Sequence, residues 1–197
     1  ALGDGACSNV GAGCVTRDRA AVMIGTSAAV RVVYAAGSAD PRPGLFLYRL
    51  DAQRFCEGGA LSDGGNLHAW LARTLQEIDD RALAERAPAA HGLVFLPFLG
   101  GERSLGWDAS RRGVIRGLSF ATTPADIAQA ALEGVAYQLA DVLDALGGVE
   151  SVMPIDVYHN GPPDVYVELH SVADVVALEP DFQRLGKLGA YGFNCFA

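Results

Sequence analysis

The sequence predicts an α/β domain, and three stretches of it indicate this class. Residues 20–34 hold two short apolar runs around Gly25-Thr26-Ser27, a pattern typical of two strands joined by a tight turn. Residues 92–99 form one short apolar run, which suits a buried strand that ends at Pro97. Residues 123–146 place apolar side chains at helical spacing after Thr123, whose hydroxyl can cap a helix. We therefore expect strands in the first part of the chain and a long helix after them.

Asp4 is a lone carboxylate between Gly3 and Gly5, and we expect it in a glycine-flanked loop. In the predicted hairpin, the glycine of the Gly25-Thr26-Ser27 turn leaves backbone N–H groups uncovered, and hydroxyls follow that can help to hold an anion. A carboxylate and a donor-rich turn suit a base and a phosphate clamp for phosphoryl transfer. The alternative is that Asp4 and its glycines form only a structural turn.

A second glycine-rich stretch, residues 62–66, precedes apolar residues at helical spacing. These residues are Leu67, Trp70, Leu71, Leu75 and Ile78. Ser62 or Asp63 is expected to cap the helix, and free N–H groups at such a helix start can bind an anion. A flexible connector is the alternative interpretation of this stretch.

Charged residues follow the predicted strand at 92–99 and include Glu102, Arg103 and Asp108. In α/β folds, ligands usually bind at the carboxyl ends of strands. Taken without other context, however, these charges are better explained by a solvated loop with Glu102 and Arg103 at the surface. The helix that begins near Thr123 is expected to be mostly core and to end before Gly147-Gly148. Glu133 lies amid its apolar stripe, either partnered in the interior or at the margin.

The character of the chain changes after Gly148. Residues 149–158 and 165–169 are predicted strands, residues 171–178 a short helix or strand, and residues 186–197 a loose end.

The bulk properties exclude some classes of partner. A net charge of −8 and a pI near 4.9 argue against a nucleic-acid or anionic-membrane surface. No apolar run approaches the roughly 20 residues that span a bilayer. The four cysteines show no C-x-x-C spacing, which predicts reduced thiols in a cytoplasmic protein rather than disulfides or a zinc site.

Three blocks of residues carry a resemblance to a known family. The first is Leu2-Gly3-Asp4-Gly5-Ala6, followed by Gly11-Ala12-Gly13 and Ile24-Gly25-Thr26-Ser27. The second is Gly59-Ala60-Leu61-Ser62-Asp63-Gly64-Gly65-Asn66, followed by Trp70-Leu71. The third runs from Leu96 to Asp108 and continues from Gly113 to Gly134. In order and spacing, over about residues 1–147, these blocks resemble the C-terminal ATP-binding domain of the FGGY family of carbohydrate kinases, of the gluconokinase and xylulokinase type.

The resemblance implies an actin-like (ribonuclease H-like) α/β ATPase domain, with a mixed sheet flanked by helices. Such a domain transfers the γ-phosphate of ATP to a hydroxyl of a sugar or sugar acid, with Mg²⁺ bridging the phosphates. Asp4 matches the family's catalytic base, while Gly25 and Thr26 match the hairpin that holds the terminal phosphates, assisted by Ser27. Gly65 matches the helix start that lines the nucleotide site.

The resemblance assigns no catalytic role to the remaining charged and aromatic residues of the third block. Glu102, Arg103 and the Trp107-Asp108 loop are expected to be structural or to line the cleft. No metal ligand is assigned to a side chain. The motif G-x-x-x-x-G-K-[ST] does not occur, so a P-loop mechanism is not supported.

Two departures from the family pattern limit what this chain is expected to do. The family's N-terminal domain, which supplies most sugar contacts, is missing, and we interpret the chain as a fragment. Where the family has a glycine-rich adenosine-binding turn, this chain has Met153-Pro154-Ile155-Asp156. We therefore expect a kinase domain over residues 1–147, an atypical tail over residues 148–197, and little or no turnover by the chain alone.

The alternative function is that of a non-catalytic actin-like module. Such a module would bind a nucleotide or a partner without catalysis. A cut domain interface leaves apolar surface exposed, and this surface would bind the partner, for example a second copy of the chain.

Overall fold

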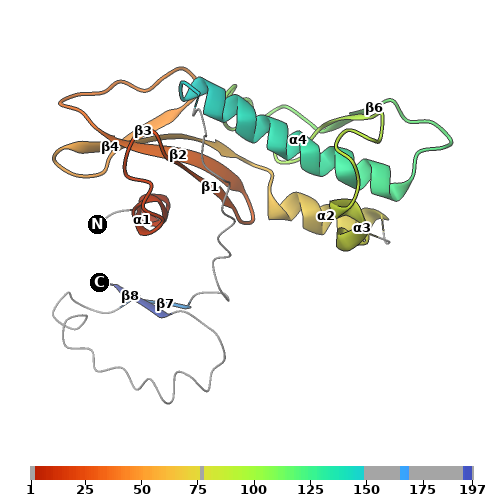
Figure 1. The fold of residues 1–197 in the computed structure, drawn as a ribbon, viewed down its shortest axis with the longest axis horizontal. Coiled ribbons are helices and arrows are strands. Elements are labelled where there is room, and N and C mark those ends of the chain that lie inside the picture. The colour runs from red at the N-terminus through yellow and green to blue at the C-terminus, as the bar shows by residue number, and fades with distance from the viewer. Residues whose placement is uncertain (1–2, 76–77, 149–164, 169–192, 197) are drawn as a thin grey trace, which may run out of the picture. The chain divides into compact units, whose positions relative to one another are not determined.

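The computed structural model describes residues 3–75, 78–148, 165–168 and 193–196, which belong to two compact units, residues 1–150 and 151–197. The elements of the first unit, in chain order, are α1 (Asp4–Gly11), β1 (Ala20–Ile24), β2 (Ala28–Ala35), β3 (Phe46–Arg49), β4 (Arg54–Leu61), α2 (Gly65–Leu75), α3 (Asp80–Ala84), β5 (Val94–Leu96), β6 (Val114–Arg116) and α4 (Pro124–Ala145). Figure 1 shows their arrangement. The predicted combination of strands and helices is confirmed.

A four-stranded sheet forms the centre of the first unit. Its strand order is β1-β2-β4-β3, and every neighbouring pair in it is antiparallel. The β1–β2 hairpin closes with Ile24 opposite Ala28, so the three residues of the Gly25-Thr26-Ser27 turn connect the two strands. This confirms the hairpin that the two apolar runs predict.

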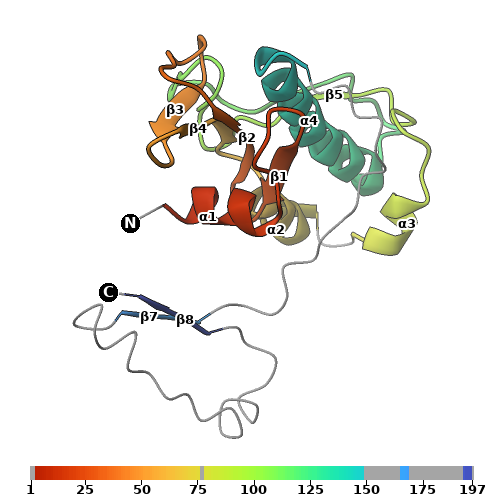
Figure 2. The ribbon, with the colours of Figure 1, turned by 60° about the vertical axis from the view of Figure 1, so that its left-hand side comes forward.

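The two faces of this sheet carry different helices. Along β2, Val30, Val32 and Tyr34 point into the larger core, which α4 completes. Val33 points to the opposite face and packs in a small cluster with Ala6 of α1. Side chains of a strand alternate between faces, so the residues at odd positions of β2 lie on the α1 side. Figures 1 and 2 show α4 and α1 on opposite faces of the sheet.

Helix α1 corrects the expectation of a loop around Asp4. Asp4 is the first residue of this helix, and Gly3 precedes it with an extended backbone. Helix α1 contains Gly, Ser and Asn, residues of low helix propensity, so no strong helical pattern is visible in the sequence. Tertiary contacts hold it instead, because Ala6 and Asn9 are fully buried and the Asn9 side chain donates to the Arg31 carbonyl over 3.1 Å.

The apolar run at 92–99 forms a shorter and less buried strand than predicted. Strand β5 has three residues, of which Phe95 is 5% exposed while Val94 and Leu96 are 55% and 44% exposed. Among the residues that the structure describes, it pairs with β6 alone, in a two-stranded antiparallel sheet that contacts α4. One face of such a ribbon is open to solvent, so the prediction of a fully buried strand is wrong.

Helix α4 begins as predicted. The Thr123 hydroxyl accepts from the Asp126 N–H, and the Asp126 carboxylate accepts from the Thr123 N–H, which is a capping box. The open question about Glu133 is answered by its partners. Its carboxylate accepts from the Ala89 N–H over 2.9 Å and lies 3.0 Å from His91 Nε2, so it is partnered at the margin of the core and holds the preceding loop against α4.

The second unit contains β7 (Val165–Glu168) and β8 (Phe193–Phe196), which pair in parallel. The strand predicted at 165–169 is therefore confirmed, whereas a loose end does not describe residues 193–196. The predictions for residues 149–158 and 171–178 lie outside the described residues. Among the helices of the described part, none has the length and apolar character needed to cross a membrane.

Candidate phosphoryl-transfer site

The hairpin turn and the start of α2 are joined by backbone hydrogen bonds. The Gly65 N–H donates to the Gly25 carbonyl over 2.7 Å, and the Asn66 N–H donates to the Thr26 carbonyl over 3.1 Å. A Cβ atom at Gly65 would lie 2.8 Å from the Gly25 oxygen, which is too close for a real side chain. Glycine is therefore required at Gly65 for this close approach, and the two glycine-rich segments form one structural unit.

The donors at the start of α2 are used within the protein, which corrects the expectation of free N–H groups there. Besides the two bonds to the turn, the Asn66 carboxamide oxygen accepts from the N–H groups of Gly64 and Leu67, over 2.8 and 2.7 Å. Asn66 thus takes the capping role expected of Ser62 or Asp63. The first turn of α2 positions the hairpin turn instead of binding an anion directly.

The hairpin turn itself retains donors. Its Gly25 N–H donates to the Ser27 carbonyl over 2.9 Å. Within the described part of the chain, the N–H groups of Thr26 and Ser27 donate to no backbone acceptor. Gly25 and Thr26 are exposed and Ser27 is half-buried, so these donors and the two hydroxyls are accessible to a ligand.

A cavity of about 510 Å³ lies beside this turn. It is bounded by the first residues of α1, the β1–β2 hairpin, β3 and the loop at residues 103–107. Asp4 and Ser27 both line it, whereas Gly25, Thr26 and Gly65 do not line it and belong to the adjoining turn and helix start. The fold therefore brings Asp4 and the hairpin turn together, although they are more than twenty residues apart in sequence.

Small residues create the floor of the cavity. Ala29 of β2 lies opposite Ala60 of β4, and both line the cavity. In the next row, Arg31 lies opposite Gly58, where a Cβ atom would be 3.0 Å from the Arg31 Cγ. Gly58 therefore leaves the space through which the Arg31 side chain crosses the sheet face.

The walls of the cavity carry charge and aromatic surface. Asp4, Arg31 and Arg103 are its charged residues, so it has one excess positive charge in a chain of net charge −8. Phe46 and Tyr48 of β3, together with Trp107, supply aromatic side chains to the lining. Sequence reasoning assigned no role to Arg31, Phe46 or Tyr48. The signal that could have found Arg31 is its position as the one charged residue in the apolar strand β2.

The loop at residues 103–107 is attached to the end of β4. The Ser104 N–H donates to the Ala60 carbonyl over 2.9 Å, and the Ala60 N–H donates to the Ser104 hydroxyl over 3.1 Å. The Trp107 indole N–H donates to the Gly44 carbonyl over 2.9 Å. Arg103 and Trp107 thus line the cavity, while Glu102 is paired with Arg111 over 3.1 Å.

Asp63, two residues after the end of β4, is a buried carboxyl outside the cavity lining. It is 2% exposed, and this burial raises its pKa to about 6, although a hydrogen bond from the Leu99 backbone lowers it. Between pH 4 and pH 6 the folded chain therefore holds a proton that the unfolded chain has lost. The contribution of Asp63 to the free energy of unfolding is therefore largest at low pH and is lost as the pH rises through about 6.

We expect Asp63→Asn to stabilise the chain relative to the parent at pH 7 by on the order of 2 kcal/mol more than at pH 4. Urea unfolding at both pH values measures this difference. Asp108→Asn is the matched control with the opposite sign, because the Ser110 hydroxyl lowers the pKa of Asp108 and that stability is lost as the pH falls. An equal effect of Asp63→Asn at both pH values would contradict the assignment.

The described residues contain no cluster of three or more His, Cys, Asp or Glu side chains that would hold a metal ion. Cys7, Cys14 and Cys56 are free thiols. Asp4 is the one carboxylate that lines the cavity among the described residues. This donor set fits a Mg²⁺ ion that is held mainly by nucleotide phosphates and water, with at most one or two protein carboxylates.

Comparison with known proteins places the chain in a family. The sequence model of the "FGGY family of carbohydrate kinases, C-terminal domain" matches residues 20–158. Gluconokinase from Bacillus subtilis is 32% identical over 158 residues, which cover 73% of this chain and 31% of the gluconokinase.

Solved structures agree with this match. The ligand-bound xylulose kinase from Lactobacillus acidophilus has a TM-score of 0.65 at 34% identity, and the gluconate kinase from the same organism has a TM-score of 0.64 at 33% identity. Each comparison covers 73% of this chain and 30% of the other.

The fold is therefore an α/β domain of the actin-like ATPase class, as the resemblance implies. The chain belongs to the FGGY family of carbohydrate kinases and contains the family's C-terminal domain. It spans about a third of the length of the relatives it matches.

Proposed function

We propose that this domain forms the ATP-binding half of a carbohydrate kinase site, which transfers the γ-phosphate of ATP to a hydroxyl of a sugar or sugar acid. The observation that carries the proposal is that Asp4 and Ser27 line one cavity. A base must reach the acceptor hydroxyl while the phosphate is held nearby, and this arrangement meets both requirements.

Asp4 is proposed as the base. Its Oδ1 accepts from the Gly5 N–H over 2.6 Å, which orients the carboxylate and leaves Oδ2 for the acceptor hydroxyl. Asp4 is the first residue of α1, so the helix fixes the place of this carboxylate at the edge of the cavity. The hydroxyl proton passes to Asp4, the hydroxyl oxygen bonds to the γ-phosphorus, and the bond to the β-phosphate oxygen breaks to release ADP.

The hairpin turn is proposed as the phosphate clamp. In this proposal the N–H groups and hydroxyls of Thr26 and Ser27 bind the terminal phosphates. The Gly65 N–H holds the turn in place through its hydrogen bond to the Gly25 carbonyl. Fixed N–H donors of this kind stabilise the charge on a transferring phosphoryl group. When bound, Mg²⁺ would neutralise part of that charge, with the phosphates as its main ligands.

We also propose the domain limits and setting. Residues 1–147 form the kinase domain and residues 148–197 an atypical tail, since the family's glycine-rich adenosine turn is replaced there. We propose a cytoplasmic protein whose partners are ATP and a carbohydrate, as for the family, together with an N-terminal domain or a second copy of the chain. The acidic net charge argues against nucleic acid or an anionic membrane as a partner.

The proposal is tested by joining the amino-terminal two thirds of the Bacillus subtilis gluconokinase ahead of this chain. We expect the fusion to release ADP in a coupled assay with gluconate or xylulose, and the 197-residue chain alone to show little or no turnover, because half a cleft leaves the reacting groups in water. Rapid phosphorylation by the chain alone would contradict the need for the other half. A fusion that shows no turnover, and that releases no heat with millimolar Mg-ATP in titration calorimetry, would indicate a non-catalytic module.

A further inference from the structure

Arg31 occupies an unusual position for a charged residue. It lies on β2 between Val30 and Val32, which are both in the core, and its own side chain turns to the cavity face. Its guanidinium lies against α1, because a Cβ atom at Gly5 would be 2.6 Å from Arg31 Cζ. Gly5 and Gly58 therefore both leave room for this one side chain.

The head group of Arg31 lacks a partner for part of its donor set. Nη1 is buried and has no hydrogen-bond acceptor among the described residues, and no carboxylate of that part lies within ion-pair distance of the guanidinium. A buried charged donor without an acceptor is costly, and a carboxylate or phosphate that accepts two N–H bonds removes this cost. The planar fork of arginine matches such anions better than the point charge of lysine.

The position of Arg31 places such an anion beside the proposed base. Arg31 follows Ser27 by four residues, so the backbones of the two residues are about 13 Å apart along the extended chain. Asp4 precedes Gly5, the residue against which the guanidinium packs, so the base lies next to the arginine. An anion at Arg31 therefore lies beside the base, where the acceptor hydroxyl must also lie.

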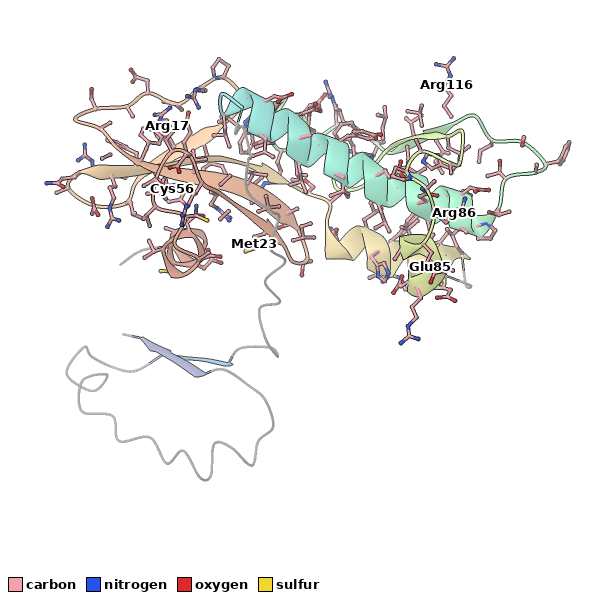
Figure 3. The ribbon with its side chains drawn as sticks, viewed as in Figure 1. Arg17, Met23, Cys56, Glu85, Arg86 and Arg116 are labelled. Atoms are coloured by element: carbon pink, nitrogen blue, oxygen red, sulfur yellow. The ribbon has the colours of Figure 1, made fainter. Side chains whose placement is uncertain are left out.

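The surroundings fit a sugar acid. The aromatic side chains of Phe46, Tyr48 and Trp107 offer apolar faces for the C–H groups of a polyhydroxylated chain. Burial raises the pKa of Tyr48, so its hydroxyl stays protonated beside Arg31 and Cys56. Cys56 lies opposite Tyr48 on the neighbouring strand and packs with Ala6 of α1; Figure 3 shows Cys56 on the α1 side of the sheet.

We propose that Arg31 binds the carboxylate of the acceptor, and that this domain therefore selects a sugar acid over a neutral sugar or polyol. This inference rests on the proposed function, because it takes Asp4 as the base that the acceptor hydroxyl reaches. In the family pattern, most sugar contacts come from the N-terminal domain. The inference adds a residue on the C-terminal domain that contributes to substrate specificity.

The test uses the 197-residue chain and the fluorescence of Trp107, which lines the cavity, with Trp107→Phe to identify its signal. The probes are gluconate, its neutral analogue sorbitol, and inorganic phosphate. We expect gluconate to bind at least tenfold more tightly than sorbitol, and Arg31→Gln to remove most of that preference, since a hydrogen bond between charged groups is stronger than one between neutral groups. Arg31→Lys should restore part of it.

Arg116→Gln is the matched control, because Arg116 is exposed on β6 and projects away from the molecule (Figure 3). It should leave binding unchanged. Equal binding of gluconate and sorbitol, or no binding of either, would overturn the inference. So would binding of phosphate that depends on Arg31 without any preference for gluconate. If the fusion enzyme phosphorylates a neutral acceptor and the 197-residue chain binds gluconate and sorbitol equally, the proposed function is supported and only this inference is wrong.

Discussion

Asp4→Asn is expected to lower phosphoryl transfer by about 10²–10⁴-fold in the fusion enzyme, with little change in ATP binding. The substitution keeps the size of the side chain. It also keeps an oxygen that can accept from the Gly5 N–H, as Asp4 Oδ1 does over 2.6 Å. It removes the carboxylate that would take the hydroxyl proton. The measurement is kcat in an ADP-release assay, with the KM for ATP determined alongside.

Asp18→Asn serves as the control for this substitution, since Asp18 is a carboxylate outside the cavity lining. It should leave kcat within about twofold. Unchanged phosphorylation by Asp4→Asn would remove Asp4 as the base and would favour the interpretation of residues 3–5 as a structural turn. A fall in kcat that came with a large rise in the KM for ATP would instead indicate a role in nucleotide binding.

Arg42→Met is expected to lower the free energy of unfolding by about 3 kcal/mol. Glu57 is 1% exposed on the α4 face of β4, and its carboxylate accepts from the Arg42 side chain over 3.3 Å and from the Tyr34 hydroxyl over 3.2 Å. The Arg42 guanidinium also donates to the Leu146 carbonyl at the end of α4 over 2.6 Å. Without Arg42, a buried carboxylate loses its cationic partner and a helix carbonyl loses its donor.

Urea unfolding followed by tryptophan fluorescence measures this loss. The double variant Arg42→Met with Glu57→Gln should be more stable than Arg42→Met alone, because the unpaired buried charge is then absent. Arg116→Met, at an exposed position, should change stability by less than about 0.5 kcal/mol. A double variant no more stable than the single one would show that the buried charge is not the cause.

The elements that the sequence predicts well are those set by local pattern. The β1–β2 hairpin follows from two apolar runs around Gly25-Thr26-Ser27, and α4 follows from the capping residues at Thr123 and Asp126. Helix α1 was not predicted, because its stability comes from burying Ala6 and Asn9 against the sheet. Strand β5 was predicted too long and too buried, since an apolar run does not reveal how many neighbours will cover it.

The candidate site divides in the same way. Asp4, the hairpin turn and Gly65 were selected by family resemblance, and their catalytic and binding roles remain proposals. Arg31 belongs to no sequence motif that could have identified it. Its position in the site depends on Gly5 and Gly58, which come from two other segments of the chain and leave space for its side chain. The donors at the start of α2 had been expected to bind an anion, and the fold uses them to hold the turn.

The sequence by itself determined the hairpin, the long capped helix and the family to which the chain belongs, because each depends on residues close together in the chain or on motif spacing. Tertiary structure alone decided that Asp4 shares a cavity with Ser27 and that an arginine with a buried, unpartnered nitrogen lies beside it. The physical reason is that cavities and unpaired donors arise from packing between distant segments. Such packing depends on which residues are small enough to let others approach, as Gly58 does for Arg31.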